Sequence, residues 1–487
     1  MAAPHLTDQS RPLGESKGTM PLYRRVLSVA GSLFLLACEG SNNRFATSAE
    51  YSSASTADSS AQQEWRSYLA DSGHSHYSPL KQINTLNVAQ LQEVWRFSAG
   101  EADNKSTLDI QCNPLIIKGI LYCTSPNLEL FALNAGNGEL LWRFDPDYQP
   151  SLYLPNPNRG VSYWAKEDDQ RILFTAGSSL YAVDARTGKP VESFGNGGKT
   201  DLRTGLPDWA SDLDVVATTP GTIFENLIIL GSRVSEAKGA APGHVRAFDV
   251  RSGELKWVFN TIPLAGAYGA DTWPTDSIGR AGGANSWAGI AVDPTLELAF
   301  VPTGSPTFDF HGADRLGDNL FANSLIALNA RTGHRVWHYQ FVKHDVWDRD
   351  LPSPPNLIDW EVNGKQVPAV AQATKTGHIF VFNRATGEPL TPIQQVPVVG
   401  TAVAGDVTAD SQPLPEFPSF TQQTFTPSTR SPLVENAVAK RLESLQPYAL
   451  YRPPGLKGSI LFPGIDGGAE WGGMAYDTKQ RRLFVNA

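Results

Sequence analysis

The chain has few cysteines, no basic cluster and few charged residues, and each of these shortages excludes a class of protein. Only three cysteines occur in 487 residues and none lies in a Cys-x-x-Cys-His motif, which excludes a covalently attached c-type haem. Its most apolar run, residues 26–37, is shorter than the roughly 20 residues of a membrane-spanning helix. The net charge is −9 and the body of the chain has no run of Lys or Arg, so we expect no nucleic-acid partner.

Glycine, proline and tryptophan are abundant instead. The chain contains 43 Gly, 35 Pro and 12 Trp, and only 18% of its residues are charged. This composition is typical of many short strands joined by turns, rather than of a helical bundle. We therefore predict an all-β fold for the main body of the chain.

The first 38 residues resemble a bacterial export leader. Met20 is followed by two arginines, the apolar run 26–37 and Cys38, and "LLAC" is similar to a lipoprotein cleavage box. We predict that Met20 is the true start, that Cys38 carries the lipid, and that the chain is anchored in the periplasm. The acidic residue after Cys38 favours the outer membrane. The alternative is a plain secretory signal with an incidental cysteine.

Residues 39–63 are rich in Ser and Ala and contain almost nothing to bury. They are predicted to form a flexible tether ahead of a folded domain at residues 64–487. The other two cysteines, Cys112 and Cys123, flank the predicted hairpin "PLIIKGILY" on one face without standing directly opposite each other. A disulfide between them is left open.

One fifteen-residue pattern occurs five times in the body of the chain. Each copy has an alternating apolar strand, then Asp or Asn, then a turn containing Gly, then a second strand. The copies begin at Leu130, Leu180, Val245, Leu325 and Ile379. Glycine suits the turn because a tight hairpin needs a residue at positive φ. With another strand pair upstream of each copy, the pattern predicts a β-propeller with four-stranded blades. The alternative, a β-sandwich, would need five coincidental copies.

Several longer motifs resemble the PQQ-dependent quinoprotein dehydrogenases, above all their glucose and quinate/shikimate branch. They include "NRGVSYW", "NSWAGIAVDP", "GDNLFANSLIALNARTG", "HDVWDRDLP" and "EWGGMAYD". The resemblance covers residue 64 to the end and implies an eight-bladed propeller with PQQ and a divalent ion near its axis. By that layout, this chain holds about five and a half blades. The strand around Trp95 would then lack the final blade, and we expect a fragment of a longer protein.

The resemblance assigns a catalytic pair. Asp348, beside Trp347 in "HDVWD", matches the base that takes the substrate hydroxyl proton while hydride passes to the quinone C5. Lys375 matches the cation that hydrogen-bonds the quinone oxygens. Without the resemblance, the acids of this stretch would be read as capping a strand end, and Lys375 as a solvated turn residue.

The same resemblance implies contacts to PQQ. A carboxylate of the cofactor would meet Arg159, and its ring would stack on Trp287. Further contacts to PQQ are predicted for Thr218, Thr307 and Asn486. Gln111 replaces the acid that is usual near the cofactor, and the adjacent-cysteine ring of other branches is missing.

The metal ligands are predicted from the same motifs. Glu236 takes the position of the acidic ligand, and Ser305 replaces the usual asparagine after "TG". The acids Asp348 and Asp350 complete the set. Hard oxygen ligands suit Ca²⁺, and a lanthanide or Mg²⁺ is left open.

A long insertion between Pro389 and Leu461 contains one predicted helix. Apolar residues recur at helical spacing after Ser431, a plausible N-cap. The helix is interpreted either as packing on the propeller rim or as a lid over the substrate.

The leading hypothesis is a periplasmic quinoprotein dehydrogenase that oxidises an alcohol, sugar or cyclic polyol. Electrons would pass to ubiquinone or to a separate c-type cytochrome. The alternatives are a non-enzymatic propeller lipoprotein of the outer-membrane assembly type and an inactive truncated homologue. A scaffold would not need Arg159, Trp287, Asp348 and Lys375 together, which favours the enzyme.

Overall fold

The computed structural model describes residues 64–100, 109–149, 157–427 and 431–487. The chain divides into two units, Met1–Thr56 and Ala57–Ala487, and every described residue belongs to the second. The predicted leader, its start at Met20, the lipid-bearing Cys38 and the tether therefore lie outside the described residues.

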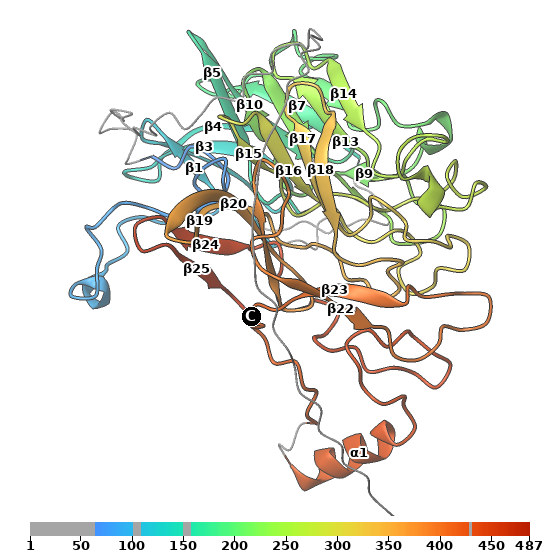
Figure 1. The fold of residues 1–487 in the computed structure, drawn as a ribbon. Coiled ribbons are helices and arrows are strands. Elements are labelled where there is room, and N and C mark those ends of the chain that lie inside the picture. The colour runs from blue at the N-terminus through green and yellow to red at the C-terminus, as the bar shows by residue number, and fades with distance from the viewer. Residues whose placement is uncertain (1–63, 101–108, 150–156, 428–430) are drawn as a thin grey trace, which may run out of the picture. The chain divides into compact units, whose positions relative to one another are not determined.

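Four sheets have four antiparallel strands each (Figure 1). Within each sheet the strands follow chain order, and only the third sheet is interrupted, by the short strand Arg233–Val234, which pairs elsewhere. The first two consist of β1 (Leu115–Ile117), β2 (Ile120–Thr124), β3 (Leu130–Asn134) and β4 (Leu140–Phe144), and of β5 (Ser162–Lys166), β6 (Asp169–Ala176), β7 (Ser179–Asp184) and β8 (Lys199–Asp201). The next two consist of β10 (Thr222–Phe224), β11 (Leu227–Leu230), β13 (Val245–Asp249) and β14 (Leu255–Phe259), and of β15 (Ala291–Asp293), β16 (Leu298–Pro302), β17 (Ser324–Asn329) and β18 (Arg335–Gln340).

The remaining sheets are smaller. A three-stranded sheet consists of β19 (Asn356–Val362), β20 (Lys365–Ala373) and β21 (Ile379–Asn383), and a final pair of β24 (Met474–Asp477) and β25 (Arg482–Val485). Two separate ribbons pair β9 (Val215–Val216) with β12 (Arg233–Val234), and β22 (Ile393–Pro397) with β23 (Ser411–Pro415). Three short 3-10 turns lie at Val88–Gln90, Asp208–Ala210 and Ala270–Thr272.

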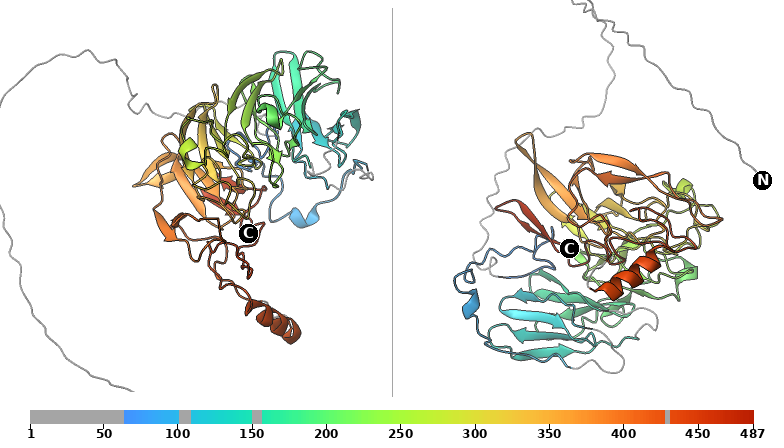
Figure 2. Two further views of the ribbon diagram at one scale, coloured as in Figure 1. Left: turned by 90° about the vertical axis from the view of Figure 1, so that its right-hand side faces the viewer. Right: turned by 90° about the horizontal axis from the view of Figure 1, so that it is seen from below.

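The sheets are arranged as in a propeller (Figures 1 and 2). The first strands β5, β10, β15, β19 and β24 contact one another in that order. An apolar core fills the space between each consecutive pair of these sheets, from the first four-stranded sheet to the final pair. The four sheets between those two therefore have a core against both faces. This confirms the predicted all-β propeller class, while the number of eight blades stays a prediction.

The repeated glycines take the backbone conformation that the pattern predicts. All five have φ between 71° and 74°, and they are Gly138, Gly188, Gly253, Gly333 and Gly387. Four of them also pack against an indole, which the sequence did not reveal. A Cβ on Gly333, for example, would lie 2.5 Å from Trp257, whose Nε1 donates to the Ala330 carbonyl at 3.2 Å. We call these contacts, which join each indole to the glycine turn that follows it along the chain, the Gly–Trp docks.

Two repeats depart from the four-stranded pattern, and both have proline two residues after the glycine. Pro190 and Pro389 make only isolated bridges to the strand before them. Proline has no N–H to donate to a strand ladder, so the expected fourth strand cannot form there. In the second repeat β8 takes its place a few residues later, and in the fifth repeat the sheet keeps three strands.

Residues 91–100, all of them described, form no strand. Instead of pairing in a ladder, Trp95 docks on the first sheet, with its Nε1 donating to the Ala135 carbonyl at 3.2 Å. The expected strand "EVWRF" is thus absent from this structure.

The segment Trp65–His76 crosses several sheets. Trp65 pairs with Ile116 at the edge of the first sheet. Farther along, the carbonyl oxygens of Ser72, Gly73 and Ser75 accept hydrogen bonds from strands of the fourth sheet, the fifth sheet and the final pair, at 2.8, 2.9 and 2.7 Å. One short segment therefore ties together sheets that are distant in sequence.

The predicted helix is present as α1 (Pro432–Leu442). Ser431 caps it, because its hydroxyl accepts the Val434 N–H at 3.3 Å. None of its side chains is buried, and it projects away from the sheets (Figure 1). The interpretation as a packing helix on the rim is therefore wrong, while the lid stays a prediction.

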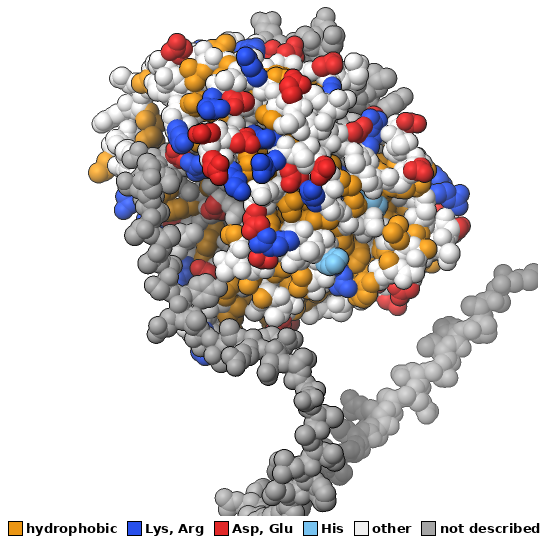
Figure 3. Space-filling model, turned by 90° about the horizontal axis from the view of Figure 1, so that it is seen from above, with side chains coloured by type: hydrophobic (Ala, Val, Ile, Leu, Met, Phe, Trp, Pro, Cys, Tyr) orange, Lys and Arg blue, Asp and Glu red, His pale blue; other side chains and the backbone are white. Residues whose placement is uncertain are grey.

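Charged side chains of both signs are interspersed on the face shown in Figure 3. Among the described residues, no helix is long and apolar enough to cross a membrane.

Candidate active site

The acids of "KHDVWDRDLP" have three different environments. Asp345 is fully buried, and its carboxylate accepts from Ser305 Oγ at 2.5 Å and Asn323 Nδ2 at 2.8 Å. It also accepts the backbone N–H groups of Trp347 and Arg349 at 2.9 and 2.7 Å. Four donors satisfy this carboxylate, so Asp345 holds the loop in shape rather than reaching substrate.

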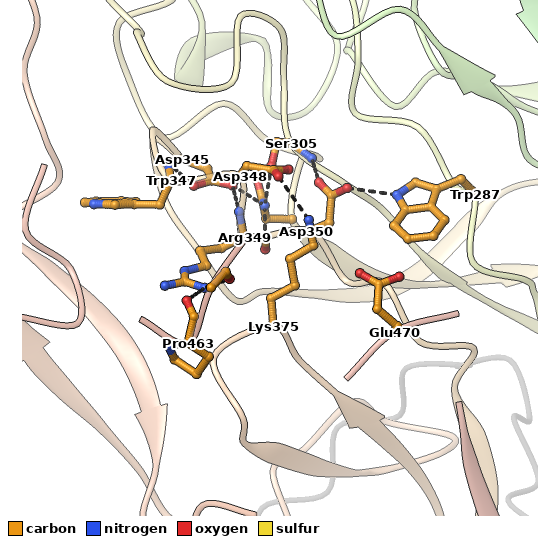
Figure 4. Close-up of polar contacts among 12 residues, drawn as sticks. Trp287, Ser305, Asp345, Trp347, Asp348, Arg349, Asp350, Lys375, Pro463 and Glu470 are labelled. Carbon is orange, nitrogen blue, oxygen red and sulfur yellow. Dashed lines mark hydrogen bonds and ion pairs between the residues drawn. The ribbon is translucent and has the colours of Figure 1, made fainter. Parts of the chain in front are cut away.

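Asp348 sits at the turn that Asp345 fixes, at φ 57°, and meets Lys375 (Figure 4). Lys375 Nζ lies 3.1 Å from Asp348 Oδ2, and the two side chains are 6% and 17% exposed. Burial, and then the neighbouring Asp350, raise the pKa of Asp348 to about 8, although Lys375 opposes that shift. Burial disfavours charge on Lys375, but Asp350, Asp348 and Glu470 outweigh it and raise its pKa.

Asp350 fixes an indole. One of its oxygens accepts Trp287 Nε1 at 2.8 Å and the other accepts the Ser305 N–H at 2.5 Å. Because the indole N–H is committed to a carboxylate, Trp287 is held in one orientation, as Figure 4 shows.

Trp347 does not lie where the motif suggested. Its indole is fully buried, donates from Nε1 to the Arg452 carbonyl at 2.8 Å and packs edge-on against Tyr451. In Figure 4 it points away from Lys375 and Trp287. The expectation of Trp347 as the indole beside the base is therefore wrong, because the turn at Asp348 sends adjacent side chains in opposite directions.

The side chains of Trp287, Asp348, Asp350 and Lys375 line one cavity of about 300 Å³. Of the predicted site residues, it collects Arg159, Glu236, Trp287, Ser305, Thr307, Asp348, Asp350 and Lys375. They come from loops after several different sheets, where a propeller brings the inner ends of its blades together.

Arg159 lies between two indoles. Its guanidinium is 5.3 Å from the ring of Trp287 and 4.6 Å from that of Trp471, and Nε donates to Gln111 Oε1 at 3.2 Å. Burial lowers its pKa to about 10, which still leaves it a cation at neutral pH. The residue that replaces the usual acid, Gln111, thus positions this arginine.

Two predicted contacts are not brought into the cavity. Thr218 is buried behind Arg159, with its Oγ1 3.3 Å from Nη1, and lines a separate small hollow. Asn486 follows β25 and is exposed to solvent. Contact of either residue with a cofactor stays a prediction.

The cavity also contains charged and aromatic residues that the sequence did not single out. They include Arg233, Asp309, Glu470 and Trp471. Asp309 is 5% exposed, and burial together with Asp350, Asp348 and Glu236 raises its pKa to about 8. The available signal was an acid between two aromatic residues in "TFDFH".

The cavity suits an anionic aromatic cofactor and a cation. Arg159, Arg233 and Lys375 supply positive charge beside two indole faces. Within the described ranges, no three His, Cys, Asp or Glu side chains form a ready-made metal cluster. Burial and neighbouring acids raise the pKa of both Asp309 and Asp348, and a bound cation would oppose that shift by stabilising the carboxylate form.

Comparison with known proteins identifies the family of the chain. The family model "Glucose/ethanol/alcohol dehydrogenase, beta-propeller domain" of the PQQ group matches residues 65–487. The chain is 32% identical to the quinoprotein glucose dehydrogenase of Escherichia coli K12, over 88% of this chain and 56% of that protein. It is 31% identical to the quinate/shikimate dehydrogenase (quinone) of Acinetobacter baylyi, over 87% of this chain and 56% of that protein.

Solved structures agree in fold. The quinohemoprotein alcohol dehydrogenase ADHIIG of Pseudomonas putida HK5 superposes with a TM-score of 0.63 at 26% identity, over 86% of this chain and 56% of that chain. The chain thus spans a little over half the length of the curated relatives it matches. With a family model matched over residues 65–487, the chain belongs to the PQQ-dependent quinoprotein dehydrogenase family.

Proposed function

We propose that this protein is a quinoprotein dehydrogenase that oxidises the hydroxyl-bearing carbon of an alcohol, sugar or cyclic polyol. One observation carries the proposal: the ion pair between Asp348 and Lys375 faces the same cavity as the fixed indole of Trp287. A scaffold has no need to bury an acid, a lysine and an oriented indole around an open cavity.

The chain's own residues divide the work of holding PQQ. Arg159 and Arg233 would hold the carboxylates of the cofactor, and Trp287, locked by Asp350, would support its ring. Lys375 would donate to the quinone oxygens, where negative charge grows during reduction. When bound, PQQ supplies a two-electron oxidant that accepts hydride from the substrate carbon.

Asp348 is the base. Its Oδ2 is held by Lys375, so its other oxygen is left to take the hydroxyl proton of the substrate. A base must be ionised, and the pKa of about 8 without a cation favours the acid form at neutral pH. A divalent cation near Glu236 and Asp348 would lower that pKa and make the base effective.

We propose Ca²⁺ for that cation, because carboxylate and hydroxyl oxygens are its preferred ligands. Glu236, Ser305, Asp348 and Asp350 all line the cavity and offer such oxygens. A lanthanide or Mg²⁺ is a competing occupant that the same donors could hold.

Substrate, electron acceptor and location complete the proposal. The relatives act on glucose and on quinate or shikimate, which supports a polyhydroxylated substrate. Electrons would leave to ubiquinone or to a c-type cytochrome. The leader with Cys38 supports a periplasmic protein held by lipid at the outer membrane.

The test is PQQ titration of the full chain with and without Ca²⁺, followed by dye-linked oxidation of glucose, quinate and glycerol. We expect calcium-dependent binding, and a loss of roughly a thousandfold in kcat for Asp348→Asn with PQQ still bound. Glu388→Gln, which changes an exposed acid far from the motif, is the matched control.

Two results would overturn the proposal. Full turnover by the Asp348→Asn variant would show that Asp348 is not the catalytic base. A folded chain that binds no PQQ under any metal condition would support the scaffold or the inactive truncated homologue instead.

A further inference from the structure

Cys112 and Cys123 lie together in a part of the chain whose neighbouring residues, Gln111 and Asn113, contact the arginine of the cavity. Both belong to one apolar cluster, where Cys123 packs with Phe131 and Leu133 and is 8% exposed, and Cys112 is partly buried against them. Both thiols are free in this structure. The mechanism proposed above uses neither of them.

The strand register places the two side chains on one face. Leu115 pairs with Tyr122 across the β1–β2 hairpin, so the position opposite Cys123 is Pro114. Cys112 lies two residues before Pro114 and is therefore the diagonal neighbour of Cys123 on the same face. It precedes β1 and belongs to no strand, so closing a disulfide at Cys112 would break no strand ladder.

The two thiols differ in chemistry. Hydrogen bonding with Cys123 lowers the pKa of Cys112, and the same contact together with burial raises the pKa of Cys123. The more exposed thiol is thus also the better thiolate, and the thiolate is the nucleophile in thiol–disulfide exchange.

The residues on either side of Cys112 both hold Arg159. Gln111 Oε1 accepts from Arg159 Nε at 3.2 Å, and the Asn113 N–H donates to the Arg159 carbonyl at 2.9 Å. A covalent link at Cys112 would therefore fix both ends of the segment that positions this guanidinium.

We propose that Cys112 and Cys123 form a reversible disulfide that clamps the Gln111–Asn113 segment and holds Arg159 in its cofactor-binding position. Cys112 attacks the disulfide of a thiol–disulfide oxidant, or of glutathione disulfide, and expels one thiolate. Cys123 then attacks the mixed disulfide and expels the second thiolate. Two thiols are oxidised by two electrons with loss of two protons, and one oxidant disulfide is reduced to two thiols. The effect on Arg159 rests on the proposed PQQ function, whereas the disulfide itself does not.

The first experiment maps the bond. The full chain is incubated with dithiothreitol or with glutathione disulfide, then unfolded in urea with an alkylating reagent present, and digested with trypsin. Cleavage after Lys118 separates the cysteines into peptides 106–118 and 119–143. We expect these peptides to be joined only after oxidation, with a thermal midpoint a few degrees higher than in the reduced protein. A folded, oxidised chain whose two thiols are both alkylated would overturn the proposal.

Single variants test the order of attack. In Cys123→Ser, Cys112 should accumulate as the mixed disulfide with glutathione. In Cys112→Ser, the buried Cys123 should stay unmodified. The opposite pattern would overturn the assignment of Cys112 as the attacking thiol.

PQQ titration tests the clamp. We expect the oxidised chain to bind PQQ about threefold more tightly than the reduced chain, because a prepositioned arginine loses less freedom on binding. Cys112→Ser should show no such difference. Equal affinity of both redox forms would overturn the clamp. If neither form binds PQQ, the proposed function fails while the peptide map still decides whether the disulfide exists.

Discussion

Trp257 and Trp287 are both indoles whose Nε1–H is used, yet they do different work. Trp257 donates to a backbone carbonyl, that of Ala330, and lies flat against Gly333. Trp287 donates to the carboxylate of Asp350 and faces Arg159 across the cavity. Contacts like that of Trp257 with Gly333 recur between several neighbouring sheets. Among the described residues, an indole N–H donates to a carboxylate side chain only in the cavity. The two indoles thus differ in the partner of their N–H: a backbone carbonyl where the indole packs on a turn, and a carboxylate where it faces the cavity.

The largest effect should come from breaking a Gly–Trp dock. Gly333→Ala adds a methyl 2.5 Å from Trp257 at φ 72°, and we expect it to lower the free energy of unfolding by about 4 kcal/mol. Gly364→Ala is the matched control, since Gly364 has φ 76° and open space around it, and should cost about 1 kcal/mol. Urea unfolding followed by tryptophan fluorescence compares the two. Equal losses would show that backbone conformation alone, and not the dock, requires glycine.

A second contact uses a histidine in place of an indole and adds charge. A Cβ on Gly312 would lie 2.4 Å from His344, whose Nε2 is 2.9 Å from Asp406 Oδ1 and whose Nδ1 is 2.8 Å from the Gly317 carbonyl. Burial raises the pKa of Asp406, but hydrogen bonds from the Gly312 N–H and His344 outweigh burial and lower it. The carboxylate therefore stabilises the fold above its ordinary pKa and loses that contribution as the pH falls.

We expect Asp406→Asn to cost about 2 kcal/mol at pH 7, with the loss closing below about pH 4. Asp410→Asn, an exposed acid of the same insertion, should change little at either pH. Thermal unfolding across this pH range measures both. A loss that does not depend on pH would indicate packing around Gly312 rather than charge.

The smallest effect should distinguish two roles of Asp350. Asp350→Asn can satisfy only one of the two donors, Trp287 Nε1 and the Ser305 N–H, so PQQ affinity should fall about tenfold, or about 1.4 kcal/mol. If Asp350 mainly orients the indole, the loss should be similar with and without Ca²⁺, and Trp287→Phe should reproduce it. A loss seen only with Ca²⁺ would instead make Asp350 a metal ligand.

Much of the architecture could be predicted from the sequence. The five glycine turns, the helix after Ser431 and the order of the strand pairs follow from local rules about φ, caps and alternation. The two repeats without a regular strand directly after the glycine turn also have a local cause. Pro190 and Pro389 have no N–H to donate to a strand ladder at that point. That signal was present in the sequence but was not used.

The candidate site was predicted in part. The motif located Asp348 and Lys375, which the structure places 3.1 Å apart. The motif could not tell which aspartate reaches the cavity, because Asp345 and Asp348 lie in one loop. The structure shows that four donors satisfy the buried carboxylate of Asp345, whereas Asp348 lines the cavity. The motif also paired Asp348 with the wrong indole, since Trp347 faces away.

The sequence by itself determined the repeat and the propeller class, because hydrophobic alternation and turn glycines are properties of neighbouring residues. Its resemblance to a known family also predicted Asp348 and Lys375 as the catalytic pair. Only the tertiary structure decided which indole faces the cavity, where the Gly–Trp docks form, and which acids gather at the cavity. Those outcomes depend on side chains far apart in the chain, such as Asp309, Asp348 and Glu470, meeting at the inner ends of different sheets. Burial there, and not local sequence, sets their charge.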